Sequence, residues 1–231
     1  MRYSWLLFDA DGTLFDYDQA EVSALKKAFD QFGLPCTPHT LATYHQINAQ
    51  MWKALEQGQI TPAALGVRRF ELLFEALSLP PLPASFSTAY LQHLADSAEL
   101  NEGAEALLQA LHPRYHLAIL TNGLKAVQRA RLARSTIRDY IEALIISEEV
   151  GAAKPDPAIF DAAMAQMGGP PKAAVLMIGD SLSSDIRGAQ RYGLDTCWYN
   201  PASLPRPADV EPLFEIQTLG QLQTLLKQID P

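Results

Sequence analysis

The sequence has few cysteines, no long hydrophobic run and no cluster of basic residues. Cys36 and Cys197 are its only cysteines, and we interpret them as reduced, buried thiols rather than as a disulfide or a zinc site. The first apolar run, Trp5 to Phe8, stops at Asp9 and is too short for a signal-peptide core or a membrane span. We therefore expect a cytoplasmic protein that does not associate with a membrane.

Positive charge is also scarce. The chain carries 18 Lys and Arg against 26 Asp and Glu, a formal net charge of −8. A polymeric nucleic acid would require a basic surface, so it is excluded as a partner. A small phosphorylated ligand is not excluded, because a local site can be positive on an acidic protein. The oligomeric state cannot be inferred from these numbers.

The apolar residues, 48% of the 231, are sufficient for a substantial core. Short apolar runs that end in polar or turn residues predict buried parallel strands. These runs are Trp5–Phe8, Leu117–Leu120, Leu144–Ile146, Val175–Ile178, Thr196–Tyr199 and, more weakly, Phe214–Ile216. Helical patterns alternate with them from Gly103 onward, at Ala104–Leu111, Lys125–Arg134, Ala158–Met167, Asp185–Tyr192 and Leu219–Ile229. This alternation predicts an α/β protein with a Rossmann-like parallel sheet and helices on both faces.

One stretch, residues 17–98, shows only helical periodicity. Prolines divide it into four predicted helices. These are Ala20–Phe32, Thr40–Gln57, Pro62–Leu77 and Phe86–Ala95. We therefore predict an all-helical domain over residues 17–98, inserted into an α/β core that comprises residues 1–16 and 99–231.

Polar residues gather where the predicted strands end. They are Asp9 and Asp11 after the first strand, Thr121 and Asn122 after the second, Asp180 and Asp185 after a later one, and Lys154 in a loop. Ligands of open parallel sheets bind at this edge. Taken singly, Lys154 could be a solvated lysine and Asp185 a favourable acid in a first helical turn. Together, four carboxylates and one lysine would repel an anion unless a divalent cation joined them.

The sequence resembles the haloacid dehalogenase superfamily in all four of its motifs. The matches are Asp9-x-Asp11-Gly-Thr-Leu, Thr121-Asn-Gly, Lys154-Pro and Gly179-Asp180-x4-Asp185. The position of the helical stretch between the first two motifs resembles members with a helical cap of the first type. The resemblance implies a phosphatase, because dehalogenases of this fold lack the second acid of the first motif, which is Asp11 here.

The resemblance also implies how the reaction proceeds. Asp9 would be the nucleophile and form an aspartyl-phosphate. Asp11 would be the general acid on the leaving oxygen and then the base for the hydrolytic water. Thr121 and the backbone N–H of Asn122 would hold phosphate oxygens, while Lys154 would bridge the phosphate and the nucleophile.

A magnesium ion completes the implied site, with Mn²⁺ as a possible substitute. Its implied ligands are the Asp9 carboxylate, the Asp11 backbone carbonyl, Asp180 and waters. Asp185 would act through a metal-bound water or through Lys154.

Three further segments resemble the pyrimidine 5′-nucleotidases within this superfamily. They are Gln46-Ile-Asn48-Ala-Gln-Met-Trp52, Ser147-Glu-Glu-Val-Gly-Ala-Ala-Lys154-Pro and Asp195-Thr-Cys-Trp-Tyr-Asn200. The implied substrate is a nucleoside monophosphate. Asn48 and Trp52, four residues apart on one predicted helix, could bind its base. The alternatives are a sugar-phosphate or phosphoglycolate phosphatase, a haloacid dehalogenase and a non-catalytic phosphate-binding module.

Overall fold

The computed structural model describes residues 1–229, which form two compact units. The α/β unit comprises Met1–Asp16 and the described residues from Ala98 onward, and the helical unit comprises Tyr17–Ser97. None of the helices in residues 1–229 combines the length and the apolar character that crossing a membrane requires.

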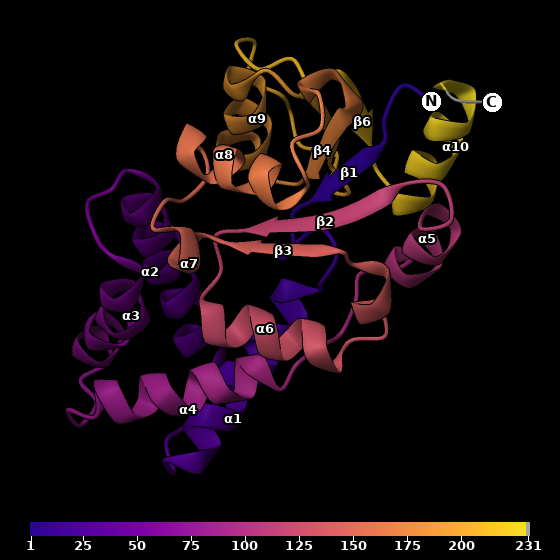
Figure 1. The fold of residues 1–231 in the computed structure, drawn as a ribbon. Coiled ribbons are helices and arrows are strands. Elements are labelled where there is room, and N and C mark those ends of the chain that lie inside the picture. The colour runs from indigo at the N-terminus through magenta and orange to yellow at the C-terminus, as the bar shows by residue number, and fades with distance from the viewer. Residues whose placement is uncertain (230–231) are drawn as a thin grey trace. The chain divides into compact units, whose positions relative to one another are not determined.

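A parallel sheet, six-stranded within the described residues, is the centre of the α/β unit (Figure 1). Its strands are β1 (Trp5–Phe8), β2 (His116–Thr121), β3 (Ala143–Ile146), β4 (Val175–Gly179), β5 (Asp195–Tyr199) and β6 (Phe214–Ile216), in the order β3-β2-β1-β4-β5-β6. β1 lies between β2 and β4, with Phe8 opposite Ile119 and Ile178. The residues that follow these three strands therefore meet at one edge of the sheet.

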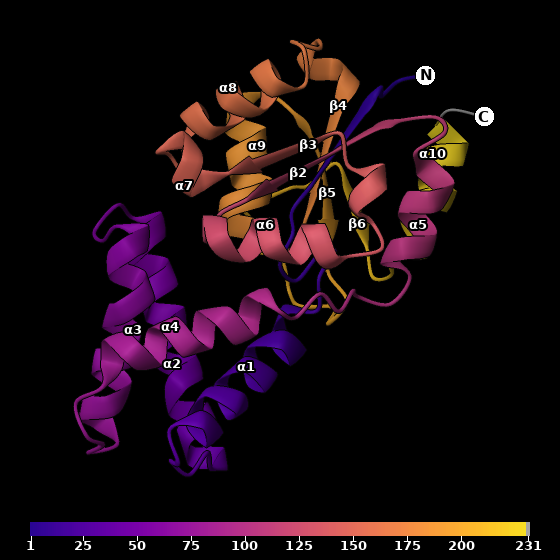
Figure 2. The ribbon, with the colours of Figure 1, turned by 60° about the horizontal axis from the view of Figure 1, so that its bottom comes forward.

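Helices cover both faces of the sheet because successive side chains of a strand point to opposite faces. Leu6 and Phe8 of β1 pack in a cluster with α5 and α10, whereas Leu7 packs with α8 and α9 on the other face. Figure 2 shows α8 and α9 on one side of the sheet and α5 and α6 on the other. The bounds are α5 (Ala104–Leu111), α6 (Lys125–Arg134), α7 (Ser147–Val150), α8 (Pro157–Gln166), α9 (Arg187–Tyr192) and α10 (Leu219–Ile229).

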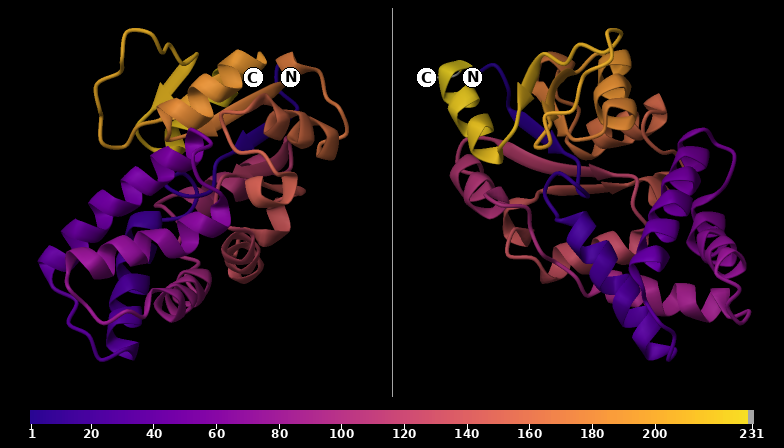
Figure 3. Two further views of the ribbon diagram at one scale, coloured as in Figure 1. Left: turned by 90° about the vertical axis from the view of Figure 1, so that its left-hand side faces the viewer. Right: turned by 180° about the vertical axis from the view of Figure 1, so that it is seen from behind.

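Four helices form the helical unit, drawn indigo to magenta in Figure 3. They are α1 (Tyr17–Gln31), α2 (Pro38–Glu56), α3 (Pro62–Ala76) and α4 (Pro83–Ala95). Proline opens three of them, at the position where its missing N–H costs nothing. Thr37 and Thr61 cap α2 and α3 through their hydroxyl oxygens. Aromatic rings fill the core of the unit, and Phe70 lies 5.1 Å from Phe86 between ring centroids.

The predicted fold class, a parallel α/β sheet with inserted helices, is confirmed. Two predictions about local structure need correction. The predicted helix Asp185–Tyr192 is split into a wide π-helical turn, η3 (Leu182–Ile186), and α9. Cys36 is only half-buried because it lies in the exposed connection between α1 and α2; both cysteines are free.

Candidate active site

The centre of the site is a buried ion pair at the end of β1. Asp9 follows the strand directly and is 7% exposed, and the side chain of Lys154 is 1% exposed. The Lys154 ammonium donates to the Asp9 carboxylate, to Asp185 Oδ1 at 2.7 Å and to the carbonyl of Leu120 at 2.7 Å. Burial alone would lower the pKa of Lys154, but the Asp185 and Asp9 carboxylates outweigh it and raise that pKa above its ordinary value. Lys154 is therefore a fixed positive charge beside the candidate nucleophile.

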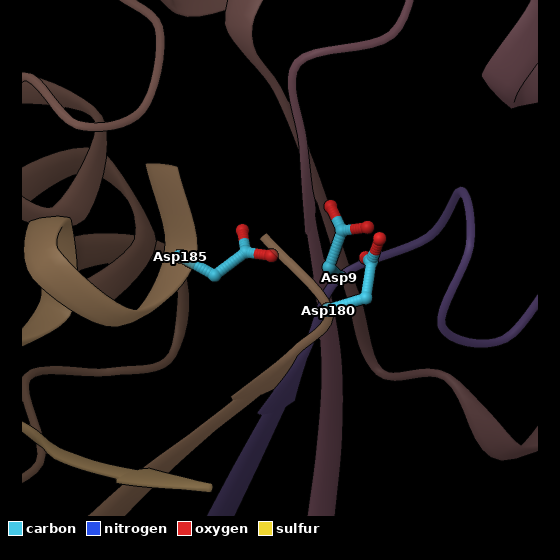
Figure 4. Close-up of side chains that lie close together, drawn as sticks. All are labelled: Asp9, Asp180 and Asp185. Atoms are coloured by element: carbon cyan, nitrogen blue, oxygen red, sulfur yellow. The ribbon is translucent and has the colours of Figure 1, made fainter. Parts of the chain in front are cut away.

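Three carboxylates converge on this position. One oxygen each of Asp9, Asp180 and Asp185 lies within 4.8 Å of the others, and Figure 4 shows the three side chains facing one another. Burial raises the pKa of Asp9 well above its usual range, and it raises the pKa of Asp180 to about 7, with the Asp185 charge adding to both. Three carboxylates beside the single ammonium of Lys154 leave the ionised cluster with an excess of negative charge. A hard divalent cation fits this oxygen-only donor set.

Two glycines make room for the acidic side chains. Gly12 has a left-handed φ of 85°, and a Cβ there would lie 2.7 Å from Asp180 Oδ2. A Cβ at Gly179 would lie 2.2 Å from Asp185 Oδ2. Both motif glycines are therefore required by close approach of a carboxylate.

The wide turn η3 explains how Asp185 reaches the site. Asp185 is fully buried, and its Oδ2 accepts a hydrogen bond from the backbone N–H of Ser181 at 3.0 Å. Its other oxygen holds Lys154. Asp185, which we predicted at the start of an ordinary helix, therefore belongs to the buried charge cluster and contacts Lys154 directly.

Asn122 connects two of the predicted motifs through its side chain. Its Nδ2 donates to the Lys154 carbonyl at 2.9 Å, and its Oδ1 accepts from the Lys154 backbone N–H at 2.8 Å. The hydroxyl of Thr121 accepts a hydrogen bond from the backbone N–H of Gly123 at 3.0 Å. The loop after β2 therefore positions the loop that carries the lysine.

Asp11 has partners that the sequence did not reveal. Its carboxylate forms an ion pair with the buried Arg131 and accepts a hydrogen bond from Gln128, both on α6. The count of four carboxylates against one lysine is corrected accordingly, because Arg131 balances Asp11. Three carboxylates then face Lys154, and the need for a cation at the cluster remains.

Thr13 and Trp198 support Asp180 and were also missed. The Thr13 hydroxyl donates to Asp180 Oδ1 at 3.0 Å, and the Trp198 indole N–H donates to the Asp180 carbonyl at 2.9 Å. The position of Thr13 within the first motif was the one feature of the sequence that could have indicated its role. The contact of Trp198 with Asp180 could not be predicted, because it requires β5, which carries Trp198, to lie beside β4, which Asp180 follows.

Asn48 and Trp52 do not share an accessible face of α2. Trp52 is half-buried, but Asn48 is 5% exposed and lies between α1 and α3. Its Nδ2 donates to Glu21 Oε1 at 2.6 Å, and its Oδ1 accepts from Arg69 at 3.1 Å. Both ends of the amide are thus bonded within the helical unit, and the predicted contact of these residues with a base stays a prediction.

Replacing Asn48 by Ala is expected to destabilise the helical unit by about 1–3 kcal/mol, the usual cost of leaving buried polar partners unsatisfied. Glu21 and Arg69 are 3% and 1% exposed, so water cannot readily replace the amide. Urea unfolding monitored by circular dichroism measures the loss. Gln59→Ala, which removes an exposed amide from the same unit, is the control and should change little. Equal stability of the two variants would contradict this role of Asn48.

Comparison with known proteins agrees with this geometry. The model of the haloacid dehalogenase-like hydrolase family matches residues 3–193. The pyrimidine 5′-nucleotidase YjjG of Escherichia coli (strain K12) is 37% identical over 98% of this chain and 99% of its own. The pyrimidine 5′-nucleotidase PynA of Streptococcus pneumoniae is 35% identical over 96% and 94%.

The crystal structure of the putative hydrolase YfnB from Bacillus subtilis, bound to magnesium, superposes with a TM-score of 0.92. It is 34% identical to this chain and covers 98% of it and 99% of its own length. The resemblance inferred from the four motifs is therefore confirmed along nearly the whole chain. The chain belongs to the haloacid dehalogenase-like hydrolases, and it is an enzyme of their phosphatase type.

Proposed function

We propose that this phosphatase hydrolyses phosphomonoesters through an aspartyl-phosphate on Asp9. The buried Asp9–Lys154 pair at the end of β1 carries the proposal. A carboxylate held at a strand end beside a fixed ammonium is a nucleophile next to a partner for the incoming phosphate. Asp11, two residues further on, supplies the second acid that phosphoryl transfer to water needs.

The proposed reaction has two steps. In the first, an oxygen of Asp9 forms a bond to phosphorus while the bond to the leaving oxygen breaks, and Asp11 protonates that oxygen. In the second, water attacks the phosphorus and gives its proton to Asp11. The bond to Asp9 then breaks, and inorganic phosphate leaves. Thr121 and the backbone N–H of Asn122 hold phosphate oxygens in both steps.

We assign Mg²⁺ to the acidic cluster, with Mn²⁺ as a possible substitute. The Asp9 and Asp180 carboxylates and the Asp11 carbonyl would hold it, and its charge would offset the repulsion between the carboxylates and a phosphate dianion. The close spacing of the three acids and the magnesium in the solved structure of YfnB support this assignment. Asp185 stays with Lys154, to which it is bonded.

The proposed substrate is a pyrimidine nucleoside 5′-monophosphate. The sheet edge offers groups for phosphate and metal, so it does not distinguish one phosphomonoester from another. The support for a nucleotide is the full-length similarity to two pyrimidine 5′-nucleotidases.

A panel of phosphorylated metabolites is expected to rank pyrimidine nucleoside 5′-monophosphates first by kcat/KM. The physical reason is that binding energy from the base and ribose adds to that of the phosphate, which every substrate shares. Phosphate release at several concentrations of each compound, with sugar phosphates and phosphoglycolate included, makes the measurement. A higher kcat/KM for any sugar phosphate than for every nucleotide would reject the nucleotidase and leave the phosphatase in place.

A further inference from the structure

Arg131 is a buried cation whose position calls for an explanation. It lies on α6, its side chain is 0% exposed, and it pairs with the 23% exposed carboxylate of Asp11. The guanidinium also lies 4.5 Å from the ring centroid of Phe15. Asp11 and Phe15 belong to the same loop after β1. A buried charge is costly unless it is paired, so Arg131 fixes this loop against α6.

Gln128, one helical turn earlier, completes the contact. It is 2% exposed, and its Nε2 donates to Asp11 Oδ2 at 2.5 Å. Arg131 Nη1 bonds the other oxygen, Oδ1. Each carboxylate oxygen of Asp11 thus has its own donor from α6, which determines both the position and the rotation of the carboxylate plane.

The second motif leaves space for this arrangement. A Cβ at Gly123 would lie 2.1 Å from Gln128 Nε2 and 2.8 Å from its Cδ. Any side chain at Gly123 would displace the Gln128 amide from Asp11. Gly123 therefore leaves the space that allows Gln128 to bond the Asp11 carboxylate beside Arg131.

We infer that Gln128 and Arg131 are positioning residues for the general acid and base, Asp11. This inference rests on the role given to Asp11 under the proposed function. Gln128 and Arg131 are almost completely buried and contact Asp11 from the interior, whereas the Asp11 side chain remains partly exposed to solvent. Each carboxylate oxygen has two acceptor sites, so one donor per oxygen leaves a site on each for proton exchange with alcohol or water.

The test compares two esters with different needs for an acid. Nitrophenolate leaves readily without protonation, whereas the alkoxide of a nucleotide does not. Asp11→Asn should slow formation of the phosphoenzyme about 10²–10⁴-fold on the nucleotide and clearly less on p-nitrophenyl phosphate. Gln128→Met and Arg131→Met should slow it on the order of 10²-fold on the nucleotide, the cost of misplacing a catalytic group by about 1 Å, and less on the aryl ester.

Single-turnover kinetics on rapid mixing isolates this step. A double-mutant cycle tests whether Gln128 acts through Asp11. Gln128→Met should slow phosphoenzyme formation little further in a protein that already carries Asp11→Asn, because the carboxylate that Gln128 positions is then absent. Arg129→Met is the matched control, since Arg129 lies on the same helix, is 55% exposed and pairs with Glu149. Arg129→Met should leave the rate of phosphoenzyme formation unchanged on both esters.

Three results would overturn the inference: equal losses on the two esters, losses that multiply with that of Asp11→Asn, or faster turnover in the variants. Should Arg131→Met fail to fold, Gln128→Met carries the same test, and Arg131→Lys should recover part of the rate through its charge. If Asp11→Asn itself affects both esters equally, the proposed role of Asp11 fails instead, so the two failures can be told apart.

Discussion

Replacing Asp9 by Asn is expected to lower turnover on the order of 10³-fold or more, as loss of a nucleophile does when no neighbouring group can replace it. An amide oxygen is a poor nucleophile and would leave no phosphoenzyme to trap. The fold should persist, because Asn has the same shape. Lys154 would keep its ion pair with Asp185 and its hydrogen bond to the Leu120 carbonyl, so the substitution does not leave the buried ammonium without a partner.

Phosphate release from p-nitrophenyl phosphate and thermal unfolding test this expectation together. Asp139→Asn is the matched control, because the same substitution then falls on a residue whose side chain is 76% exposed and paired only at the surface with Arg138. Activity of Asp9→Asn above a few per cent of wild type, with a folded protein, would show that another residue is the nucleophile. A large drop in melting temperature would show instead that the carboxylate is structural.

Removing divalent metal with EDTA is expected to abolish activity, and added Mg²⁺ or Mn²⁺ should restore it. Without a cation, three carboxylates face one lysine, and a phosphate dianion would be repelled. Ca²⁺ should restore activity poorly, since its longer bonds and looser coordination would misplace the Asp9 oxygen. Full activity in a metal-stripped, EDTA-treated sample would reject the metal role.

A stability measurement tests the metal independently of turnover. Binding to the folded state alone should stabilise it by about 2.7 kcal/mol at a Mg²⁺ concentration of 100 times Kd. Wild type and Asp139→Asn should show this rise in unfolding midpoint, whereas Asp180→Asn should show little. An equal rise in all three would place the ion elsewhere.

The sheet was predictable because its strands are short apolar runs buried on both faces. β1 and β6 have the predicted bounds, and the other strands differ by a residue or two at their ends. Proline positions predicted the order of the helices in the helical unit, although α1 and α4 begin three residues earlier than expected. α7 went unpredicted because four residues are too few to show a helical period.

The acids of the site were predictable for a different reason: a charged residue directly after a buried strand needs a partner. That reasoning names Asp9 and Asp180, but it cannot name the partners. Gln128 and Arg131 look like ordinary polar residues of an exposed helix in the sequence, because only the packing of α6 shows which of its faces is buried. The partners of Asn48 could not be predicted for the same reason, since its burial depends on how α1 and α3 cover α2.

The paired hydrogen bonds between the Asn122 amide and the Lys154 backbone have a consequence for engineering. They join the two loops directly, so the chain between them need not keep a fixed length to hold the lysine in place. That intervening chain includes the short 3₁₀ helix η1 (Arg138–Tyr140), in which Arg138 and Asp139 are exposed, and exposed surface segments accept inserted domains best. A reporter domain grafted there would leave Lys154 held by Asn122, which makes this segment a site for building a sensor.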